Sequence, residues 1–375
     1  MEAGDSATDE LFLRQAIELA ERGRFTCAPN PCVGCLIVRD GVILGRGFHH
    51  RTGTGHAEVN AIADAGEDIT GATVYISLEP CAFVGRTPAC ARTLVDKKVK
   101  RVVVAAVDPH PRVSGTGLQI LRDAGIQVRH IELPEAVELI SGYISRVTLG
   151  RPLVRLKTAA SLDGATALAS GESQWITGPE ARGDVQYWRA RSDAIVTGSG
   201  TVREDDPALT VRDAQLQPCE QPLRVVLNGQ LSLSADLQVF DGQTPTLLVH
   251  AEDTRAPQSW MSRSGVELLP LGASATQPSH LDLPALLAEL GQRGCNEVLV
   301  EAGATLCGEF VRNGLWDEWL MYVAPKLLGS QSRGLAEFSL DRLAQAPTAT
   351  IKDVRQVGSD LRIHLFNAHG AESGS

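Results

Sequence analysis

Along this chain of 375 residues, the spacing of hydrophobic positions changes repeatedly between a helical period and a strand period. Helical spacing comes first, from Asp9 to Gly23, and predicts a helix with Asp9 as its N-cap and Gly23 beyond its end. The apolar run CVGCLIV then meets a turn at residues 39–41 and a second run, VILGRGF, which together predict a β-hairpin. Strands and helices alternate afterwards, as far as a helix near Ser145.

The pattern divides the chain into two halves that meet at LGRP, residues 149–152. The first half predicts a layered α/β domain of about five strands. The second half begins a new run of strands at LVRLKTAASLDG, which continues through DAIVTG, LRVVLN, TLLVH, EVLVEAG and EWLMYVAP, with helices between some of them. Stretches rich in Pro, Ser and Gln, at about 215–221 and about 251–280, predict long loops, and the final AHGAESGS predicts a disordered tail.

Composition and charge narrow the class of protein. The net charge of −10 argues against a nucleic-acid or membrane partner, because tracking phosphates requires basic patches. No run approaches the roughly 20 apolar residues that span a bilayer, and the acidic start MEAGDSATDE does not resemble a signal peptide. Eight cysteines without a regular framework fit a reducing compartment. We therefore expect a cytoplasmic protein with a small-molecule substrate.

The strongest chemical signal is His56-Ala57-Glu58, followed by Pro80-Cys81 and Cys90. This order matches the zinc deaminase signature H-x-E…P-C-x-x-C, except that the second cysteine stands nine positions after the first. A catalytic zinc takes three protein ligands and keeps a fourth position for water, whose pKa it lowers toward neutrality. Glu58 is then predicted to be the acid/base that moves protons, and not a ligand. The simpler alternative, a capping histidine and buried cysteines, is disfavoured because four residues coincide in order and context.

A second cysteine motif, Cys32-Val33-Gly34-Cys35, has the spacing of a redox pair or half a zinc site. It lies in an apolar, β-rich run, and residues three apart on a strand point to opposite faces. We therefore interpret both cysteines as core packing. The remaining cysteines have no partner at ligand spacing and receive the same interpretation: Cys27, Cys219, Cys295 and Cys307.

The second half carries a weaker candidate site. EVLVEAGATLCGEFVRNG predicts a strand, a glycine turn and a helix, so that amides from Gly303 to about Gly308 could bind a phosphate. It lacks the Gly-Lys-Ser/Thr of a P-loop, and DAIVTGSGTVRED lacks the third glycine of a Rossmann fingerprint. From spacing alone, Gly303 is almost as well explained as an ordinary turn glycine. Charged residues outside any motif are more often solvated surface charges than ligands. From the sequence alone this applies to Lys157, Asp163, Arg189 and Arg212.

Eight sequence blocks together resemble the bifunctional riboflavin-biosynthesis deaminase/reductase family of bacteria. They are APNPCVGC, HAEVNAI, SLEPCAFVGRTPAC, KTAASLDG, SGESQWITG, DDPALTVR, VEAGATL and APKLLG, and they run from about residue 10 to the C-terminal strands. The lengthened cysteine spacing is that family's form of the motif. The resemblance implies an α/β protein with a zinc-dependent, cytidine-deaminase-like three-layer α/β/α domain at 1–147. It also implies an NADPH-dependent, dihydrofolate-reductase-like α/β domain at 152–368, before a disordered tail at 369–375.

The resemblance further implies two reactions. The first is zinc-dependent hydrolytic deamination of 2,5-diamino-6-(5-phosphoribosylamino)pyrimidin-4-one. The second is reduction by NADPH of the ribosyl group of 5-amino-6-(5-phosphoribosylamino)uracil to a ribityl chain. We expect one Zn²⁺ per chain and a homo-oligomer, either a dimer or a tetramer.

Individual residues follow from matching positions in the blocks. By this resemblance, we expect His56, Cys81 and Cys90 to bind zinc and Glu58 to be catalytic. We likewise expect Asn30 and His49 to face the pyrimidine. Lys157 and Asp163 support the hydride path, and Gly229 stands where the family often has a serine that binds the cofactor. The matching cofactor positions are Ala159, Trp175, Thr201, Asp205, Gly303, Ala304, Thr305, Leu306, Cys307, Gly308 and Glu309. The matching substrate positions in the reductase half are Ser173, Arg189, Leu209, Arg212 and Glu301.

Two alternatives are weighed against this interpretation. One is a deaminase of a free or tRNA base fused to an unrelated binding domain, which the acidic charge and the blocks SGESQWITG and VEAGATL disfavour. The other is a non-catalytic zinc module joined to a protein-binding domain. A structural zinc site would require a fourth protein ligand, and the sequence offers none at a suitable position.

Overall fold

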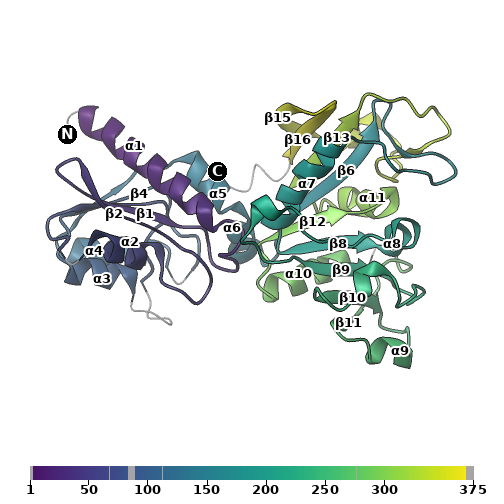
Figure 1. Cartoon of the computed structure of the whole chain (residues 1–375), viewed down its shortest axis with the longest axis horizontal. Coiled ribbons are helices and arrows are strands. Elements are labelled where there is room, and N and C mark those ends of the chain that lie inside the picture. The colour runs from purple at the N-terminus through teal and green to yellow at the C-terminus, as the bar shows by residue number, and fades with distance from the viewer. Residues whose placement is uncertain (1–2, 67, 83–88, 112, 276, 369–375) are drawn as a thin grey trace. The chain divides into compact units, whose positions relative to one another are not determined.

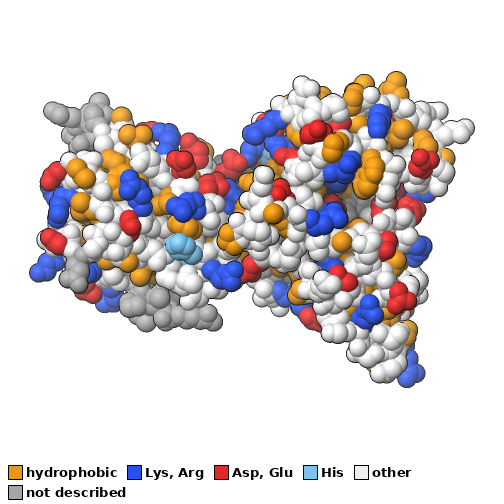
Figure 2. All heavy atoms as spheres, in the orientation of Figure 1, with side chains coloured by type: hydrophobic (Ala, Val, Ile, Leu, Met, Phe, Trp, Pro, Cys, Tyr) orange, Lys and Arg blue, Asp and Glu red, His pale blue; other side chains and the backbone are white. Residues whose placement is uncertain are grey.

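The computed structural model describes residues 3–66, 68–82, 89–111, 113–275 and 277–368. It divides into two compact units, residues 1–150 and 151–375 (Figure 1). The predicted disordered tail at 369–375 lies outside the described residues. Within the described part of the chain, none of the helices combines the length and the apolar character needed to cross a bilayer. Basic and acidic side chains are interspersed over the face drawn in Figure 2.

The N-terminal unit is built on a five-stranded sheet with the order β2-β1-β3-β4-β5. The predicted hairpin forms its antiparallel edge, while β3, β4 and β5 are parallel. The strands are β1 (Gly34–Arg39), β2 (Val42–Phe48), β3 (Thr73–Ile76), β4 (Arg101–Val104) and β5 (Gln127–His130). The helices are α1 (Ala3–Ala20), α2 (Ala57–Ala65), α3 (Cys90–Asp96), α4 (Thr116–Asp123), α5 (Pro134–Leu139) and α6 (Ser141–Leu149).

Alternation along the strands places helices on both faces of this sheet. On β1, Leu36 and Val38 join a core with residues of α1, α5 and α6, whereas Cys35 and Ile37 join a core with residues of α2, α3 and α4. Successive strand residues point to opposite faces, so each strand contributes to both cores. The unit is therefore a layered α/β domain of five strands, as the sequence pattern predicts, in the three-layer α/β/α form that the family resemblance implies.

The predicted N-cap at Asp9 is wrong. The helix α1 begins at Ala3, so Asp9 lies inside it, and its side chain is only 1% exposed. Its carboxylate accepts hydrogen bonds from Arg101 of β4, Arg129 of β5 and the Tyr75 hydroxyl of β3. A carboxylate with charged partners on neighbouring strands can be buried, and no local sequence pattern shows those partners.

The C-terminal unit contains a nine-stranded sheet with the order β11-β10-β9-β8-β12-β6-β13-β16-β15. It is parallel from β11 to β13, and β16 and β15 continue it in antiparallel pairing. The strands are β6 (Leu153–Ser161), β8 (Ala194–Gly198), β9 (Leu223–Leu227), β10 (Thr246–Ala251), β11 (Val266–Leu271), β12 (Glu297–Glu301), β13 (Glu318–Ala324), β15 (Ala349–Val357) and β16 (Asp360–Asn367). The helices are α7 (Pro179–Arg191), α8 (Ser199–Asp205), α9 (Gln258–Met261), α10 (Leu283–Gln292) and α11 (Ala304–Arg312). A separate small sheet pairs β7 (Ala165–Ala167) with β14 (Arg333–Gly334).

The long loop predicted at about 251–280 is partly wrong, because α9 and β11 lie within it. β11 runs parallel to β10 at the edge of the sheet, where Pro270 is tolerated because an edge strand bonds on one side only. Leu268 and Leu269 pack toward opposite cores of the unit. The alternation of side chains on β11 is difficult to recognise in the sequence, because Pro and Ser residues surround the strand.

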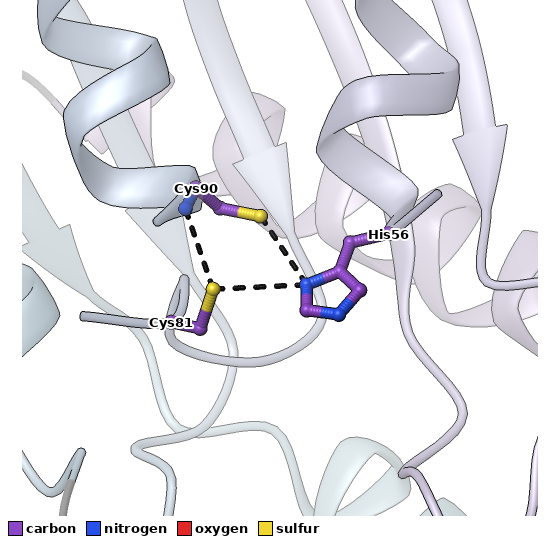
Figure 3. Close-up of side chains that lie close together, drawn as sticks. All are labelled: His56, Cys81 and Cys90. Atoms are coloured by element: carbon purple, nitrogen blue, oxygen red, sulfur yellow. Dashed lines mark hydrogen bonds between the residues drawn. The ribbon is translucent and has the colours of Figure 1, made fainter. Parts of the chain in front are cut away.

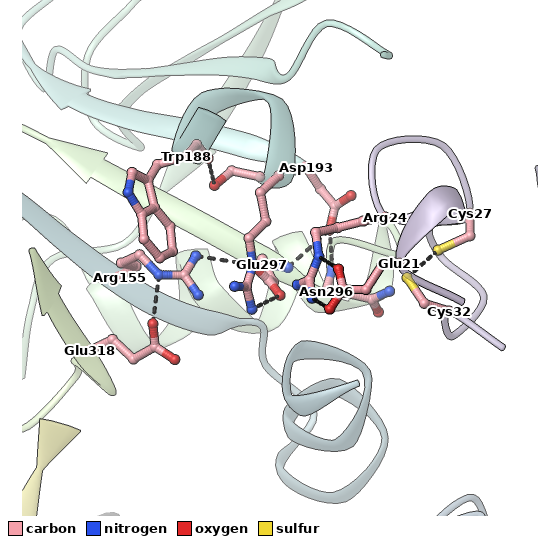
Figure 4. Close-up of polar contacts among 12 residues, drawn as sticks. Glu21, Arg24, Cys27, Cys32, Arg155, Trp188, Asp193, Asn296, Glu297 and Glu318 are labelled. Carbon is pink, nitrogen blue, oxygen red and sulfur yellow. Dashed lines mark hydrogen bonds and ion pairs between the residues drawn. The ribbon is translucent and has the colours of Figure 1, made fainter. Parts of the chain in front are cut away.

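A buried ion cluster joins three central strands of this sheet (Figure 4). Arg155 of β6 is fully buried and donates hydrogen bonds to Glu297 of β12 and Glu318 of β13, at 2.9 and 2.6 Å. Its guanidinium lies 4.8 Å from the ring centroid of Trp188. Burial alone would raise the pKa of Glu318, but the charge of Arg155 outweighs it and lowers that pKa strongly. Both carboxylates thus compensate the buried charge of Arg155, while its Nη2 atom is buried without a hydrogen-bond partner among the described residues.

Candidate active sites

In the N-terminal unit, His56, Cys81 and Cys90 converge from three separate segments (Figure 3). His56 precedes α2, Cys81 follows β3, and Cys90 is the first residue of α3. The His56 Nδ1 atom lies 3.6 Å from Cys81 Sγ and 3.3 Å from Cys90 Sγ. His56 forms no side-chain capping bond to α2, so its ring is directed to the thiols and not to the helix end.

The cluster fits a zinc ion. With Zn–S of about 2.3 Å and Zn–N of about 2.0–2.1 Å, tetrahedral coordination separates a nitrogen and a sulfur ligand by about 3.5 Å. The two His56–cysteine distances, 3.6 and 3.3 Å, bracket that value. Among the described residues, the cluster contains these three possible ligands and no fourth. Three protein ligands with one open position are typical of a catalytic zinc site and not of a structural one.

The two thiols differ in their protonation. A hydrogen bond from Cys90 lowers the pKa of Cys81 to about 4, while the same interaction raises the pKa of Cys90. The hydrogen bond with Cys81 raises the pKa of His56. The Cys90 backbone N–H also donates to Cys81 Sγ at 3.3 Å, as expected for a thiolate beside the first turn of a helix. The pocket is thus arranged for an anionic ligand set that attracts a cation.

Glu58 lies in the first turn of α2, two residues after His56, and is only 3% exposed. Burial, followed by the nearby charge of Cys81, raises the pKa of its carboxyl. A carboxyl whose pKa is raised by burial holds a proton more readily than an exposed one, which suits a general acid/base.

Asn30 and His49 lie together beside this cluster. The His49 Nδ1 atom is 3.1 Å from the Gly55 carbonyl and must donate to it, so Nε2 accepts from the Asn30 amide at 3.0 Å. Burial lowers the pKa of His49, which fits this neutral tautomer. The His49 and His56 rings are in edge contact, with centroids 5.6 Å apart. His49 therefore fixes the orientation of the Asn30 amide near the candidate metal site.

Sequence reasoning missed the role of Glu79, which precedes Pro80-Cys81. Its buried carboxylate accepts four backbone N–H groups, from Asp108, Gly115, Gly117 and Leu118, at 2.8–3.3 Å. These bonds hold the segment leading into α4 against the turn that carries Cys81. The only signal in the sequence is a carboxylate next to the metal motif.

Cys32 and Cys35 lie on opposite faces of the sheet, in two different cores. A thiol contact that the sequence did not suggest joins Cys32 to Cys27, whose Sγ atoms are 2.9 Å apart (Figure 4). No disulfide links any of the eight cysteines. Cys32 and Cys35 cannot bind one metal ion together in this arrangement.

In the C-terminal unit, Glu301 at the end of β12 forms the centre of a charged group. Arg189 donates to both of its carboxylate oxygens, at 2.6 and 3.0 Å, and Lys157 Nζ lies 3.7 Å away. Burial alone would raise the pKa of Glu301, but the charges of Arg189 and Lys157 outweigh it and lower the pKa to about 2. Glu301 is therefore a permanent anion at neutral pH.

Arg189 and Arg212 both match substrate positions of the family. They differ in whether the guanidinium is available to bind a ligand. Arg189 is buried, and besides Glu301 it donates to the Thr210 carbonyl at 3.1 Å, so its guanidinium is already engaged. Arg212 is exposed, and only its backbone N–H has a partner in a described residue, Gln186. Between them Leu209 adopts a left-handed backbone (φ 50°), an unusual conformation for a branched residue. Arg212 is the arginine left free to bind a ligand.

The candidate cofactor segments meet at the carboxyl edge of the parallel strands. The Gly303 N–H donates to Thr201 Oγ1 at 3.1 Å, which joins the turn after β12 to α8. Gly303 is the N-cap of the nine-residue α11, has no side-chain cap, and a Cβ there would meet only Thr201 Oγ1, at 3.8 Å. A pyrophosphate fits this open turn, since the first amides of a helix point outward and attract anions.

The segment around Ser173 and Trp175 lies near the same edge. The Gln174 side chain donates to Asp205 at 3.3 Å, and Lys326 Nζ donates to the Trp175 carbonyl at 2.7 Å. Trp175 is 62% exposed, and the Arg182 guanidinium lies 4.5 Å from its ring centroid. An exposed aromatic ring held in this way offers a flat surface to a ligand. Ala159, on β6, pairs with Tyr322 of β13 and is half-buried.

The later members of the α11 segment face other parts of the unit. Cys307 is fully buried, and burial raises its pKa to about 12. A Cβ at Gly308 would lie 2.2 Å from the Glu337 carbonyl oxygen, so this glycine allows close packing. Glu309 pairs with Arg312 at 2.6 Å and lies 3.2 Å from His280. Only the turn itself, from Gly303 to Leu306, is placed at the open end of the helix.

Two family models match the chain. The model described as "RibD C-terminal domain" matches residues 152–363, more than half of the chain. The model described as "Cytidine and deoxycytidylate deaminase zinc-binding region" matches residues 6–106. Each matched range lies within one of the two compact units, which meet between residues 150 and 151.

Full-length relatives and solved structures agree with these matches. The riboflavin biosynthesis protein RibD of Escherichia coli (strain K12) is 46% identical over 373 residues, which cover 96% of this chain and 100% of that protein. RibD of Haemophilus influenzae is 42% identical, covering 96% and 97%. A structure of Acinetobacter baumannii RibD has a TM-score of 0.88 at 42% identity, covering 96% of this chain and 99% of that chain. A diaminohydroxyphosphoribosylaminopyrimidine deaminase/5-amino-6-(5-phosphoribosylamino)uracil reductase from Thermotoga maritima has a TM-score of 0.85 at 32% identity, covering 96% and 99%.

Proposed function

Since this chain belongs to the RibD family of riboflavin-biosynthesis proteins, we propose that residues 1–147 form its deaminase domain and residues 152–368 its reductase domain. The protein is a bifunctional enzyme of riboflavin biosynthesis, a deaminase that uses Zn²⁺ and a reductase that uses NADPH. The observation that carries the residue assignment is the convergence of one histidine and two cysteines beside the buried Glu58.

In the deaminase, His56, Cys81 and Cys90 hold the zinc, which when bound lowers the pKa of water and so supplies a nucleophile. Glu58 moves two protons in turn: the first from the water to the ring nitrogen, and the second from the added hydroxyl to the amino group, which then leaves as ammonia. Asn30, held by neutral His49, donates from its amide to the pyrimidine. The raised pKa of the Glu58 carboxyl supports this shuttle, because the group can hold the proton between the two transfers.

In the reductase, NADPH supplies a hydride to the opened ribose. The turn from Gly303 to Leu306 binds the pyrophosphate through backbone amides, with Thr201 and Trp175 at its sides. Arg212 binds the ribose phosphate, and Ser173 and Leu209 border the same site. Glu301 holds Arg189 and Lys157 in place; we assign Arg189 a positioning role, because its hydrogen-bond donors face Glu301 and Thr210. Asp163 fixes the turn at residues 328–329, whose amides it accepts at 2.8–3.1 Å.

The alternative of a deaminase fused to an unrelated binding domain is not favoured, because the second unit matches the RibD C-terminal domain over residues 152–363. We further propose that the enzyme acts in the cytoplasm as a homodimer or homotetramer. The absence of disulfides among its eight cysteines supports a reducing compartment. Sedimentation velocity at several protein concentrations measures the oligomeric state.

One experiment tests both assignments. The purified full-length protein is incubated with the diamino-pyrimidinone ribose phosphate, and ammonia release and NADPH absorbance are followed separately. We expect ammonia without NADPH present, and NADPH oxidation that follows deamination. NADPH oxidation without prior ammonia release would contradict the assignment. So would the absence of both ammonia release and NADPH oxidation.

A further inference from the structure

A polar group that the proposed mechanism does not use lies at the end of β9. In the sheet, β9 is adjacent to β8, and β8 is adjacent to β12, so the three carboxyl ends lie side by side. The proposed pyrophosphate turn joins the segments that follow β8 and β12, through the bond from Gly303 to Thr201. In Rossmann sheets, a side chain about 20 residues beyond the phosphate-binding turn contacts the adenosine ribose. The residues after β9 are therefore placed to contact its 2′ position.

Three side chains form this group. The Asn228 Oδ1 atom accepts from the backbone N–H and the hydroxyl of Ser232, at 3.1 and 3.3 Å. The same Ser232 hydroxyl accepts from Arg203 Nη2 at 3.2 Å. Arg203 and Ser232 are exposed, whereas Asn228 is only 1% exposed. The exposed guanidinium is thus directed to the strand end and held there by one hydrogen bond.

In the described part of the chain, a buried amide without a hydrogen-bond partner and an arginine without a counter-charge occur together at this place. The Asn228 Nδ2 atom is buried and has no hydrogen-bond partner among the described residues. Arg203 forms no ion pair with any described residue. A buried amide without a partner costs free energy unless a ligand or water supplies an acceptor. A Cβ at Gly229 would meet nothing within 4 Å, so the space beside Asn228 is open.

The charges around Arg203 favour an anionic ligand. The segment from 228 to 235, Asn-Gly-Gln-Leu-Ser-Leu-Ser-Ala, contains no carboxylate. The acidic residues that follow Arg203 bond elsewhere: Glu204 to Arg333, Asp205 to Gln174, and Asp206 to Gln238. Sites that select NADH place a carboxylate at this strand end to bind the 2′-hydroxyl, whereas sites that accept NADPH place an arginine nearby.

We propose that Arg203, together with Ser232 and the Asn228 amide, binds the 2′-phosphate of NADPH and selects NADPH over NADH. This inference rests on the proposed function, in which the cofactor lies across the Gly303 turn. A phosphate monoester carries about −1.5 to −2 charges at neutral pH and offers three acceptor oxygens. The guanidinium fork matches two of them, and the Ser232 hydroxyl or the Asn228 amide donates to the third. In NADH the 2′-hydroxyl provides no charge for Arg203.

The test measures cofactor binding by the full-length protein, without turnover. Dissociation constants for NADPH, NADH and adenosine 2′,5′-bisphosphate are determined by titration calorimetry for the natural protein, Arg203→Ala and Arg355→Ala. Arg355 is a matched control, because it is an exposed arginine on β15 that pairs with Asp353. Arg203→Ala should weaken NADPH and the bisphosphate by about 10- to 100-fold, the range of a charge-assisted hydrogen bond. NADH should change by less than about twofold, and Arg355→Ala should change nothing.

The outcomes separate this inference from the proposed function. If the natural protein bound neither NADPH nor NADH, the proposed cofactor site would be wrong. If it bound NADPH normally and Arg203→Ala kept that affinity, the 2′-phosphate assignment alone would be overturned. Equal weakening of NADPH and NADH would also overturn it, because a 2′-phosphate contact cannot act on NADH. As a second variant, Ser232→Asp places a carboxylate beside Arg203 and should likewise weaken NADPH selectively.

Discussion

Glu58 and Glu301 are both buried carboxylates, at 3% and 8% exposure, yet their neighbours differ. Beside Glu58 are the thiols of the metal cluster, and burial together with the charge of Cys81 raises the pKa of its carboxyl. Beside Glu301 are Arg189 and Lys157, which outweigh burial and lower the pKa to about 2. Burial alone thus does not determine what a carboxylate does. The comparison supports the proposed role of Glu58 as a proton carrier and makes Glu301 a fixed anion.

The largest expected effect is that of Glu58→Gln. The glutamine amide keeps the shape of the side chain but cannot carry the proton, so ammonia release should fall by about 10²- to 10⁴-fold. Zinc content, measured by atomic absorption, should stay the same, and NADPH oxidation with deaminated substrate should continue. Glu10→Gln is the control, because Glu10 forms an exposed ion pair with Arg14. Loss of zinc would make Glu58 a ligand, and loss of both activities would contradict two independent sites.

Glu301→Gln should reduce stability and not proton transfer. It leaves Arg189 buried with only neutral partners, the new amide and the Thr210 carbonyl, so the free energy of unfolding should fall by about 3–5 kcal/mol. The control is Glu267→Gln, whose carboxylate also accepts two bonds from one arginine but is exposed, so it should change stability by less than about 1 kcal/mol. Chemical denaturation followed by tryptophan fluorescence measures both. Equal effects of the two variants would remove the distinction between the buried and the exposed pair.

The same pair predicts a pH dependence. Because the pKa of Glu301 is below that of an unfolded glutamate, about 4.3, its stabilising contribution is complete above that pH. The contribution is lost as the pH falls through the folded value of about 2. In the Glu301→Gln variant, the free energy of unfolding should therefore depend less on pH between about pH 4.5 and pH 2 than it does in the natural protein.

Arg212→Ala tests whether the exposed arginine, and not the engaged Arg189, binds the ribose phosphate. The KM of the reduction should rise by about 10- to 100-fold through loss of a charge-assisted contact. Deamination and the dissociation constant of NADPH should stay nearly the same, as should all parameters of the control Arg355→Ala. Arg212→Lys should restore little, because a point charge does not reproduce the guanidinium fork. Unchanged reduction kinetics would remove Arg212 from the site.

The smallest effect on chemistry is expected from replacing Cys32 and Cys35 together with alanine. The two thiols pack in different cores and are not in the metal cluster, so the protein should still bind one zinc per chain. Stability should fall by roughly 1 kcal/mol per buried thiol removed. Cys81→Ala or Cys90→Ala should instead release the metal. A double variant at 32 and 35 without zinc would overturn the ligand assignment.

The sequence by itself determined the features that depend on local order and period. The hairpin, the alternation that gives β1 two buried faces, and the set of His56, Cys81 and Cys90 beside Glu58 could all be read from short windows. This is possible because strand and helix periods are encoded within a few residues of each other, and because the His-x-Glu and Pro-Cys parts of the metal motif are each short local patterns.

Tertiary structure alone decided which charged residues are engaged and which are available. Arg189 and Glu301 are 112 residues apart in sequence, and Asp9 meets an arginine 92 residues away, so no local pattern shows that these pairs are buried. The same holds for Arg203 and Ser232, 29 residues apart, which meet because α8 follows β8, Ser232 follows β9, and these two strands are neighbours in the sheet. Burial and charge pairing are set by contacts between distant segments, and they determine whether a carboxylate carries protons or an arginine is free to bind phosphate.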